Sequence, residues 1–248
     1  MTAKTLFLAW QDKRLTREWF PIGRLDVQTG KPTHRFRYTR GAERACESTG
    51  FETLLDFPRM DRAYESSDLF PLFRNRVMWP RRPDFSEYLR MLDLPETAEP
   101  FEILSVSGGY RMTDTFEVFP RIVRDPDGSF SCRFFLHGRR HVNSASLRRL
   151  DDLQPGEKLF LTIELTNPTA RLAVQIQTED YYMIGWAPRY LAEDLVRAIA
   201  VSSGDYGARV VRINSAPAPS GQRLLVEFVG RWPDYEPMSN GDYEPLVH

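Results

Sequence analysis

Five arginines are concentrated between Phe130 and Leu150, and no Asp or Glu interrupts them. They are Arg133, Arg139, Arg140, Arg148 and Arg149. A guanidinium binds phosphate through a planar fork of N–H donors, and the rings of Phe135 and His141 lie among the arginines to stack on bases. The stretch therefore predicts a phosphate track. The alternative is a solvated face whose arginines pair with Asp151, Asp152 or the acidic end of the chain.

The net charge of the whole chain does not reveal this basic segment. The 248 residues carry 33 basic and 34 acidic side chains, for a formal net charge of −1. Residues 234–248 hold four acids and no Lys or Arg, whereas residues 121–233 hold 15 basic and 12 acidic side chains. The charge therefore does not exclude nucleic acid as a partner. Arginines outnumber lysines 29 to 4, which fits either phosphate recognition or the codon usage of a GC-rich genome.

Motifs for catalysis or metal binding are absent. Cys132, His137 and His141 are zinc-ligand types, but no fourth ligand is evident and alternating strand faces separate such side chains. Ser107-Gly108-Gly109 lacks the Lys-Ser/Thr of a phosphate-binding loop and is typical of a turn. We expect no catalytic residue, metal or cofactor. A hydrolase with its site between Ser107 and Asp114 is the competing hypothesis.

The sequence also excludes several classes of protein. Its longest apolar runs, such as Leu6–Trp10, are far shorter than the roughly 20 residues that cross a bilayer. The N-terminus has too few apolar residues for a signal peptide. Only two cysteines occur, which is not a disulfide framework. We therefore expect a cytoplasmic protein without a membrane partner.

Hydrophobic periodicity predicts an α+β fold. Strands are expected at 6–10, 19–27, 34–38, 101–106, 115–119, 130–136, 159–165, 172–176, 182–186, 209–214 and 223–229. Helices are expected at 42–48, 67–78, 85–92 and 189–199. The turn Asp125-Pro126-Asp127-Gly128 marks a domain boundary. The predicted parts are 1–122, a mixed β-sheet module with short helices; 128–232, a small β-barrel with one helix; and 233–248, an acidic tail.

The second part contains a series of short motifs: Phe134-Phe135-Leu136-His137-Gly138, Leu153-Gln154-Pro155-Gly156, Asn167-Pro168, Ala173-Val174 and Ile184-Gly185-Trp186 with Pro188 and Leu191. In their order and spacing these motifs resemble the HIRAN domain. The resemblance implies a β-barrel that binds a single-stranded 3′ DNA end. Aromatic side chains there stack the terminal bases, and an acid recognises the terminal hydroxyl.

This sequence departs from that pattern after Asn167-Pro168. End-binding members have Tyr-Asp at the next two positions, where Thr169 and Ala170 stand here. The resemblance then implies looser binding of single-stranded DNA or DNA ends. The predicted nucleic-acid-binding residues are Phe135, His137, Arg139, Arg140, Arg171, Trp186 and Arg189.

The first part contains the segments Leu8-Ala9-Trp10, Ile22-Gly23-Arg24-Leu25, Phe36-Arg37-Tyr38 and Leu69-Phe70-Pro71-Leu72-Phe73 with Asn75. These segments are similar to the N-terminal lobe of HipA-type toxin kinases. Residues 101–109 resemble the approach to that family's glycine loop, but no kinase core follows. The resemblance implies an accessory role.

Two functions compete on this basis. The first is a non-catalytic nucleic-acid-associated protein of a bacterial toxin–antitoxin or defence system. The second is a protein-interaction or regulatory module for a HipA-like kinase or another protein. The acidic tail repeats Asp-Tyr-Glu-Pro at 234–237 and 242–245, and it either covers the basic segment, binds a partner or is an ordinary disordered tail.

Overall fold

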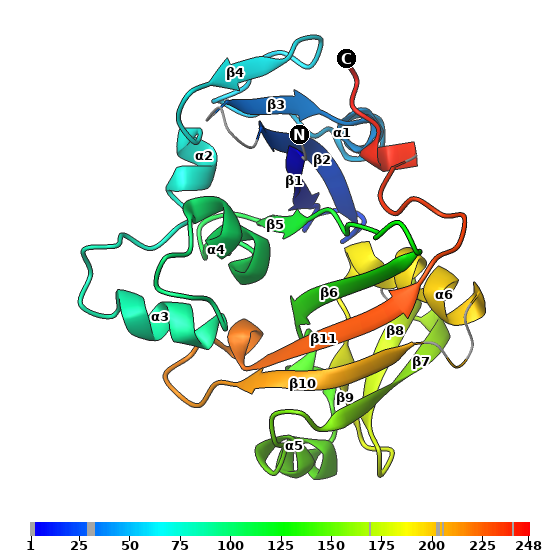
Figure 1. The fold of residues 1–248 in the computed structure, drawn as a ribbon. Helices are drawn as coiled ribbons and strands as arrows, with labels where there is room; N and C mark the ends of the chain where they lie inside the picture. The colour runs from blue at the N-terminus through cyan, green and yellow to red at the C-terminus, as the bar shows by residue number, and fades with distance from the viewer. Residues whose placement is uncertain (1–2, 29–32, 169, 202–203, 205, 240) are drawn as a thin grey trace. The chain divides into compact units, whose positions relative to one another are not determined.

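The computed structural model describes residues 3–28, 33–168, 170–201, 204, 206–239 and 241–248 (Figure 1). The chain forms two compact units, each assembled from separate stretches of sequence. Unit 1 comprises Met1–Phe85, Thr97–Arg121 and Met238–His248, and unit 2 comprises Ser86–Glu96 and Ile122–Pro237. The predicted α+β class is confirmed. The predicted division into parts 1–122, 128–232 and 233–248 stays a prediction.

Unit 1 is built on a five-stranded antiparallel sheet with the order β4-β3-β2-β1-β5. Its strands are β1 (Ala3–Gln11), β2 (Trp19–Gln28), β3 (His34–Tyr38), β4 (Tyr64–Ser66) and β5 (Phe116–Pro120). Its helices are α1 (Arg40–Thr49), α2 (Pro71–Arg74), α4 (Pro100–Ser107) and the 3-10 turn η4 (Gly241–Tyr243). Both α1 and η4 pack against β2, so the last residues of the chain complete this unit.

Aromatic side chains form the core of unit 1. The rings of Phe36 and Phe57 stack with their centroids 3.8 Å apart. The Tyr38 hydroxyl donates to the Phe57 carbonyl and accepts from the Leu54 amide, both at 2.7 Å. Burial raises the pKa of Tyr38 to about 12, so this hydroxyl stays protonated and keeps both bonds.

A single buried carboxylate ties three strands of this sheet together. Asp26 on β2 accepts hydrogen bonds from Thr5 on β1 at 2.6 Å, from Arg24 at 2.9 Å and from Arg37 on β3 at 2.7 Å. Burial opposes ionisation of Asp26, but the Thr5 hydroxyl and the two guanidinium groups outweigh it and lower its pKa. Arg37 also donates to the carbonyl of Val247 at 3.1 Å, which adds the C-terminal segment to the network.

The acidic tail is bound to the folded units. In its second Asp-Tyr-Glu-Pro copy, Asp242 pairs with Arg44 at 2.6 Å, Glu244 pairs with Arg40 at 2.9 Å and Tyr243 packs edge-on against Phe7. These acids therefore neutralise arginines of unit 1.

The first copy of the repeat docks within unit 2. The Tyr235 hydroxyl donates to Asp194 at 2.9 Å, and the guanidinium of Arg197 lies over the Tyr235 ring. In both copies the tyrosine is the side chain that packs on the unit, so the described part of the tail differs from an ordinary disordered tail.

Unit 2 contains a six-stranded antiparallel sheet with the order β6-β11-β10-β7-β8-β9. Its strands are β6 (Ser129–Phe135), β7 (Lys158–Asn167), β8 (Arg171–Thr178), β9 (Met183–Trp186), β10 (Gly207–Ile213) and β11 (Leu224–Arg231). Its helical elements are α3 (Phe85–Met91, from Ser86 on), η1 (Arg139–His141), α5 (Ser144–Asp151), η2 (Arg189–Leu191), α6 (Ala192–Val201) and η3 (Ser220–Gln222).

The sheet of unit 2 is curved, so that β7, β8 and β9 pass behind β10 and β11 (Figure 1). Helix α6 packs against both β8 and β11, which are not neighbours in the sheet. No strand ladder among the described residues joins the edge strands β6 and β9, so the closed barrel stays a prediction.

Two predicted elements are wrong. The predicted strand at 101–106 is helix α4: Glu99 and Glu102 form a capping box, and Pro100 occupies the first helical turn. The predicted helix at 67–78 shrinks to the four residues of α2. Helix α5 was not predicted, although Asn143 caps it by accepting from the Ser146 amide at 2.8 Å. None of the helices in the described ranges is long and apolar enough to cross a membrane.

The Asp26 network predicts a large and pH-dependent effect on unit 1. Asp26→Asn leaves the partly buried Arg24 and Arg37 without their carboxylate, so we expect a loss of about 3 kcal/mol in the free energy of unfolding, measured with denaturant. Because folding lowers the Asp26 pKa, the wild-type stabilisation is complete above the unfolded pKa of about 3.9 and is lost as the pH falls through the folded pKa.

The control for this prediction is Asp61→Asn, which breaks the exposed Arg59–Asp61 pair of the same unit. The unfolding midpoint of this control should equal that of the wild type. Equal midpoints for the two variants would show that the Asp26 network does not stabilise unit 1.

Candidate nucleic-acid interface

Two edge segments of unit 2 meet at one pair of backbone hydrogen bonds. The His137 amide donates to the Trp186 carbonyl at 2.9 Å, and the Trp186 amide donates to the His137 carbonyl at 3.0 Å. His137 follows β6 and Trp186 ends β9. This bridge therefore links the two outer strands of the six-stranded sheet.

Two glycines permit this close approach. Gly138 has a φ of +76°, and a Cβ at this position would collide with the Trp186 ring. A Cβ on Gly185 would lie 2.5 Å from the His137 carbonyl oxygen. The sequence motifs that end in His137-Gly138 and begin with Ile184-Gly185 are thus the two sides of one backbone contact.

Trp186 is fixed in orientation and half-buried. Its indole N–H donates to Glu164 Oε2 at 2.8 Å, and the Asn167 amide donates to the same oxygen at 3.0 Å. Both hydrogen bonds lower the pKa of Glu164, and the bond from Asn167 contributes more than the bond from Trp186. The indole is consequently held over Gly138, the residue that precedes Arg139 and Arg140 in the chain.

The five arginines of the predicted phosphate track differ in availability. Arg139 pairs with Asp151 at 3.1 Å. Arg133 pairs with Asp93 and Glu227, each at 3.0 Å. These two arginines are therefore partly neutralised by acids outside the track.

The other three arginines lie on or near α5. Arg149 pairs with Glu157 and, at 3.0 Å, with Asp180. Arg140 is exposed and its Nε donates to His141 Nε2 at 3.0 Å, and Arg148 is exposed. Arg133, Arg139 and Arg149 thus pair with acids, as expected for a solvated face whose arginines are charge-paired. Asp151, the partner of Arg139, is one of the acids that the sequence analysis named for such pairing.

The remaining predicted contact residues occupy different environments. Phe135 is 6% exposed and packs in the core, so its ring offers no free face for the predicted stacking. Arg189 in η2 is partly buried, which lowers its pKa. Arg171 begins β8, but its side chain, like Thr169, lies outside the described residues. The structure therefore brings together His137, Arg139, Arg140 and Trp186.

The residues named in the metal and hydrolase hypotheses have the following positions in the structure. The described residues contain no group of three metal-ligating side chains, and burial raises the pKa of the Cys132 thiol. Gly108 and Gly109 end helix α4 with positive φ angles. Asp114 forms an ion pair at 2.6 Å with the buried Arg76. The segment from Ser107 to Asp114 is thus a helix end and an ion-pair partner.

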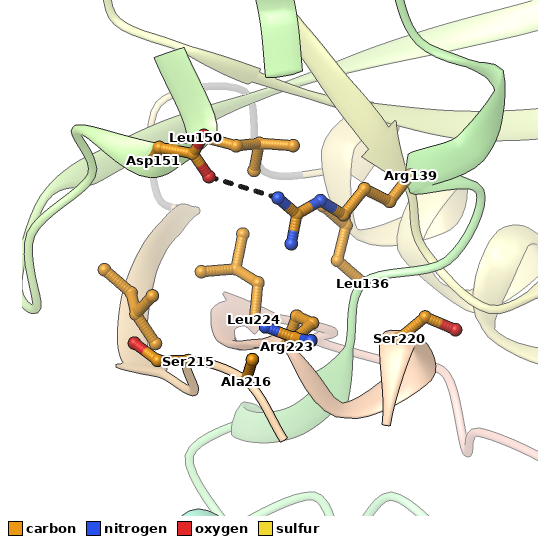
Figure 2. Close-up of a pocket in the computed structure, with 10 residues that line it drawn as sticks. Leu136, Arg139, Leu150, Asp151, Ser215, Ala216, Ser220, Arg223 and Leu224 are labelled. Atoms are coloured by element: carbon orange, nitrogen blue, oxygen red, sulfur yellow. Dashed lines mark hydrogen bonds and ion pairs between the residues drawn. The ribbon is translucent and has the colours of Figure 1, made fainter. Parts of the chain in front are cut away.

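A pocket of about 320 Å³ lies next to Arg139 and was not predicted. Figure 2 shows the Arg139–Asp151 ion pair along one side and Ser215 and Arg223 on the other. The segments that line it come from η1, α5, the connection after β10 and the start of β11. Its residues are too far apart in sequence to form a recognisable motif.

Comparison with known proteins agrees with the arrangement of the motifs. Residues 129–232 match the HIRAN domain family. The matched HIRAN region spans every strand of the unit 2 sheet. Curated protein sequences give no match to the chain. A crystal structure of a protein from Lactobacillus plantarum, a structural genomics target, is similar with 17% sequence identity and a TM-score of 0.31, covering 42% of this chain and 100% of that one.

The glycine at the bridge yields a stability prediction for the HIRAN region. Gly138→Ala requires both a left-handed alanine and displacement of the Trp186 ring. Gly156→Ala is a matched control, because Gly156 has a φ of +87° with no atom within 4 Å of the added Cβ. We expect Gly156→Ala to cost about 1 kcal/mol and Gly138→Ala about 2 kcal/mol more. Equal losses in denaturant unfolding would contradict the close packing of Trp186 on Gly138.

Proposed function

We propose that the HIRAN region of this protein binds single-stranded nucleic acid without catalysing a reaction on it. HIRAN domains are generally linked to binding of single-stranded DNA. The observation that carries the proposal is the position of Trp186, which is held over Gly138 beside Arg139 and Arg140. An indole next to guanidinium groups combines a stacking surface with phosphate contacts.

The charge pattern supports moderate, salt-sensitive affinity. Arg140 and Arg148 are exposed. Arg139 is engaged by Asp151, whose side chain is 73% exposed. Ion pairs in water contribute little free energy, so a strand phosphate competes effectively with Asp151 for Arg139. Arg133 and Arg149 each hold two acids, and we assign them no phosphate contact.

In this proposal the strand is bound along its length, and the 3′ hydroxyl is not recognised by an acid. Ala170 stands where end-binding members have an acid. Glu164, the carboxylate next to Trp186, already accepts from Trp186 and Asn167. The barrel closure implied by the resemblance would place the two edge strands on either side of the His137–Trp186 bridge.

Unit 1 suggests a second candidate function, an interaction with another protein. Its described surface exposes large apolar side chains, with Trp79 71% exposed, Tyr110 68% and Met112 92%. Such side chains are typical of protein-binding surfaces. The HipA-like kinase partner belongs to this second candidate, whereas the toxin–antitoxin or defence setting belongs to the first. Both rest on the resemblance of residues 1–122 alone.

The proposal predicts the effect of removing two positive charges beside Trp186. In Arg139→Gln/Arg140→Gln we expect the affinity for a single-stranded oligonucleotide to fall about a hundredfold, since the variant loses two charged hydrogen bonds of roughly 1.5 kcal/mol each. The slope of log K against log salt should decrease by about 1.4, because each phosphate contact on a single strand contributes about 0.7. Fluorescence anisotropy at several salt concentrations measures both quantities.

The matched control is Arg74→Gln/Arg81→Gln, which removes two exposed arginines of unit 1. This variant has the same net charge but should retain the wild-type affinity and slope. An equal loss in both double variants would indicate binding by overall charge and contradict the proposed site.

A further inference from the structure

The pocket beside Arg139 contains a positive charge, that of Arg223, which pairs with no acid among the described residues. Arg223 lines this pocket, and among the described residues its guanidinium has no ion pair, while its Nε is buried without an acceptor. By contrast, Arg133, Arg139, Arg149, Arg209 and Arg212 of the same unit each pair with an acid. The positive charge of a guanidinium that lines a pocket and pairs with no acid attracts an anion, so an anion in this pocket would be stabilised by Arg223.

The other groups of the pocket define the chemistry of this anion. The hydroxyls of Ser215 and Ser220 supply further hydrogen-bond donors, while Leu136, Leu150 and Leu224 supply apolar surface (Figure 2). Guanidinium and hydroxyl donors together suit phosphate oxygens. The apolar side chains suit a sugar or a base. A volume of about 320 Å³ is near the lower limit for small-molecule sites, which fits one nucleotide.

The charges favour a monoester over the phosphodiesters within a strand. Arg139, Arg223 and Asp151 give the pocket a formal charge of +1. Asp151 is 73% exposed and is held by one ion pair to Arg139, so it can turn into solvent when a ligand arrives and leave two arginines. A phosphate monoester carries nearly two negative charges at neutral pH, whereas a diester carries one. Only the monoester matches both arginines.

We propose that the Arg139–Arg223 pocket binds the phosphate monoester of a terminal nucleotide, so that the protein distinguishes a phosphorylated strand end from a hydroxyl end. This inference rests on the proposed binding of single-stranded nucleic acid by Trp186, Arg139 and Arg140, and it makes the phosphate that Arg139 contacts the terminal one when the strand end is phosphorylated. It assigns Arg223 to the terminal phosphate and makes Asp151 the competitor that the phosphate displaces.

The test compares internally labelled oligonucleotides of one sequence with a 5′-phosphate, a 3′-phosphate or hydroxyls at both ends, by fluorescence anisotropy. We expect one phosphorylated strand to bind about tenfold more tightly than the hydroxyl strand, the gain of one charged hydrogen bond or more. Arg223→Gln should abolish this gain and leave the hydroxyl strand's affinity unchanged. Asp151→Asn, a change at an exposed side chain, should increase the affinity of the phosphorylated strand about threefold because Arg139 is released.

The control Arg148→Gln removes an exposed arginine of helix α5 that does not line the pocket. It should weaken binding of phosphorylated and hydroxyl strands by the same factor and leave their ratio unchanged. Equal affinities for all strands in the wild-type protein would overturn the terminal-phosphate inference while leaving the proposed function intact.

A second measurement separates failure of the inference from failure of the proposed function. If no oligonucleotide binds, the proposed function fails, and adenosine monophosphate is titrated by calorimetry. Binding that is lost in Arg223→Gln would support the phosphate-monoester pocket with a free nucleotide as its ligand. Absence of any heat of binding would overturn the pocket as well.

Discussion

The pair of backbone hydrogen bonds between His137 and Trp186 is the contact on which the candidate site depends. Two strands that are outermost in the sheet are joined there, and the joint is possible because Gly138 and Gly185 carry no side chain. The same contact sets Trp186 over the start of η1. Arg139 and Arg140 are therefore positioned by sheet geometry rather than by a free loop, and any change that separates the two segments also separates the indole from the guanidinium groups.

In unit 2, ion pairs determine which arginines are available to a ligand more than the number of basic residues does. The net charge of residues 121–233 is positive, but Glu227 alone accepts from both Arg133 and Arg209, and Asp93 approaches Arg133 and Arg212. Such shared carboxylates remove arginines from the pool available to phosphate. Arg140 and Arg148, by contrast, are exposed, and Arg223 lines the pocket beside Arg139.

Much of the fold could be predicted from sequence where the pattern is local. Strand β3 has the predicted bounds, and α3 follows the i, i+3, i+4 spacing of Phe85, Tyr88 and Leu89. The segment 101–106 failed because a continuous apolar run fits a strand and a buried helix equally well. Its signal lay outside the run, in Glu99 and Pro100. Local patterns thus predict elements well only where periodicity is unambiguous.

The site was less predictable, because its determinants are not local. His137, Arg139, Arg140 and Trp186 come together as the family motifs imply, yet Phe135 turns into the core. Neighbouring strand residues point to opposite faces, but Phe134 and Phe135 are both buried, so both faces are covered at this end of β6, which the local sequence does not state. Arg223 lies 84 positions after Arg139, and nothing in the composition around it distinguishes it from other arginines. Only the folded sheet shows that these two line one pocket.

The acid that controls access to Arg139 is consequently a neighbour in the fold and not the acidic tail. Asp242 and Glu244 are engaged by Arg44 and Arg40 of unit 1, and the docked Tyr243 holds that segment in place. Asp151 instead stands at the end of α5 with most of its side chain in water. Breaking an exposed pair costs little, whereas withdrawing the tail would break several contacts together. A ligand phosphate therefore has to compete with one weakly held carboxylate, which makes the interface open to ligand while the tail stays bound.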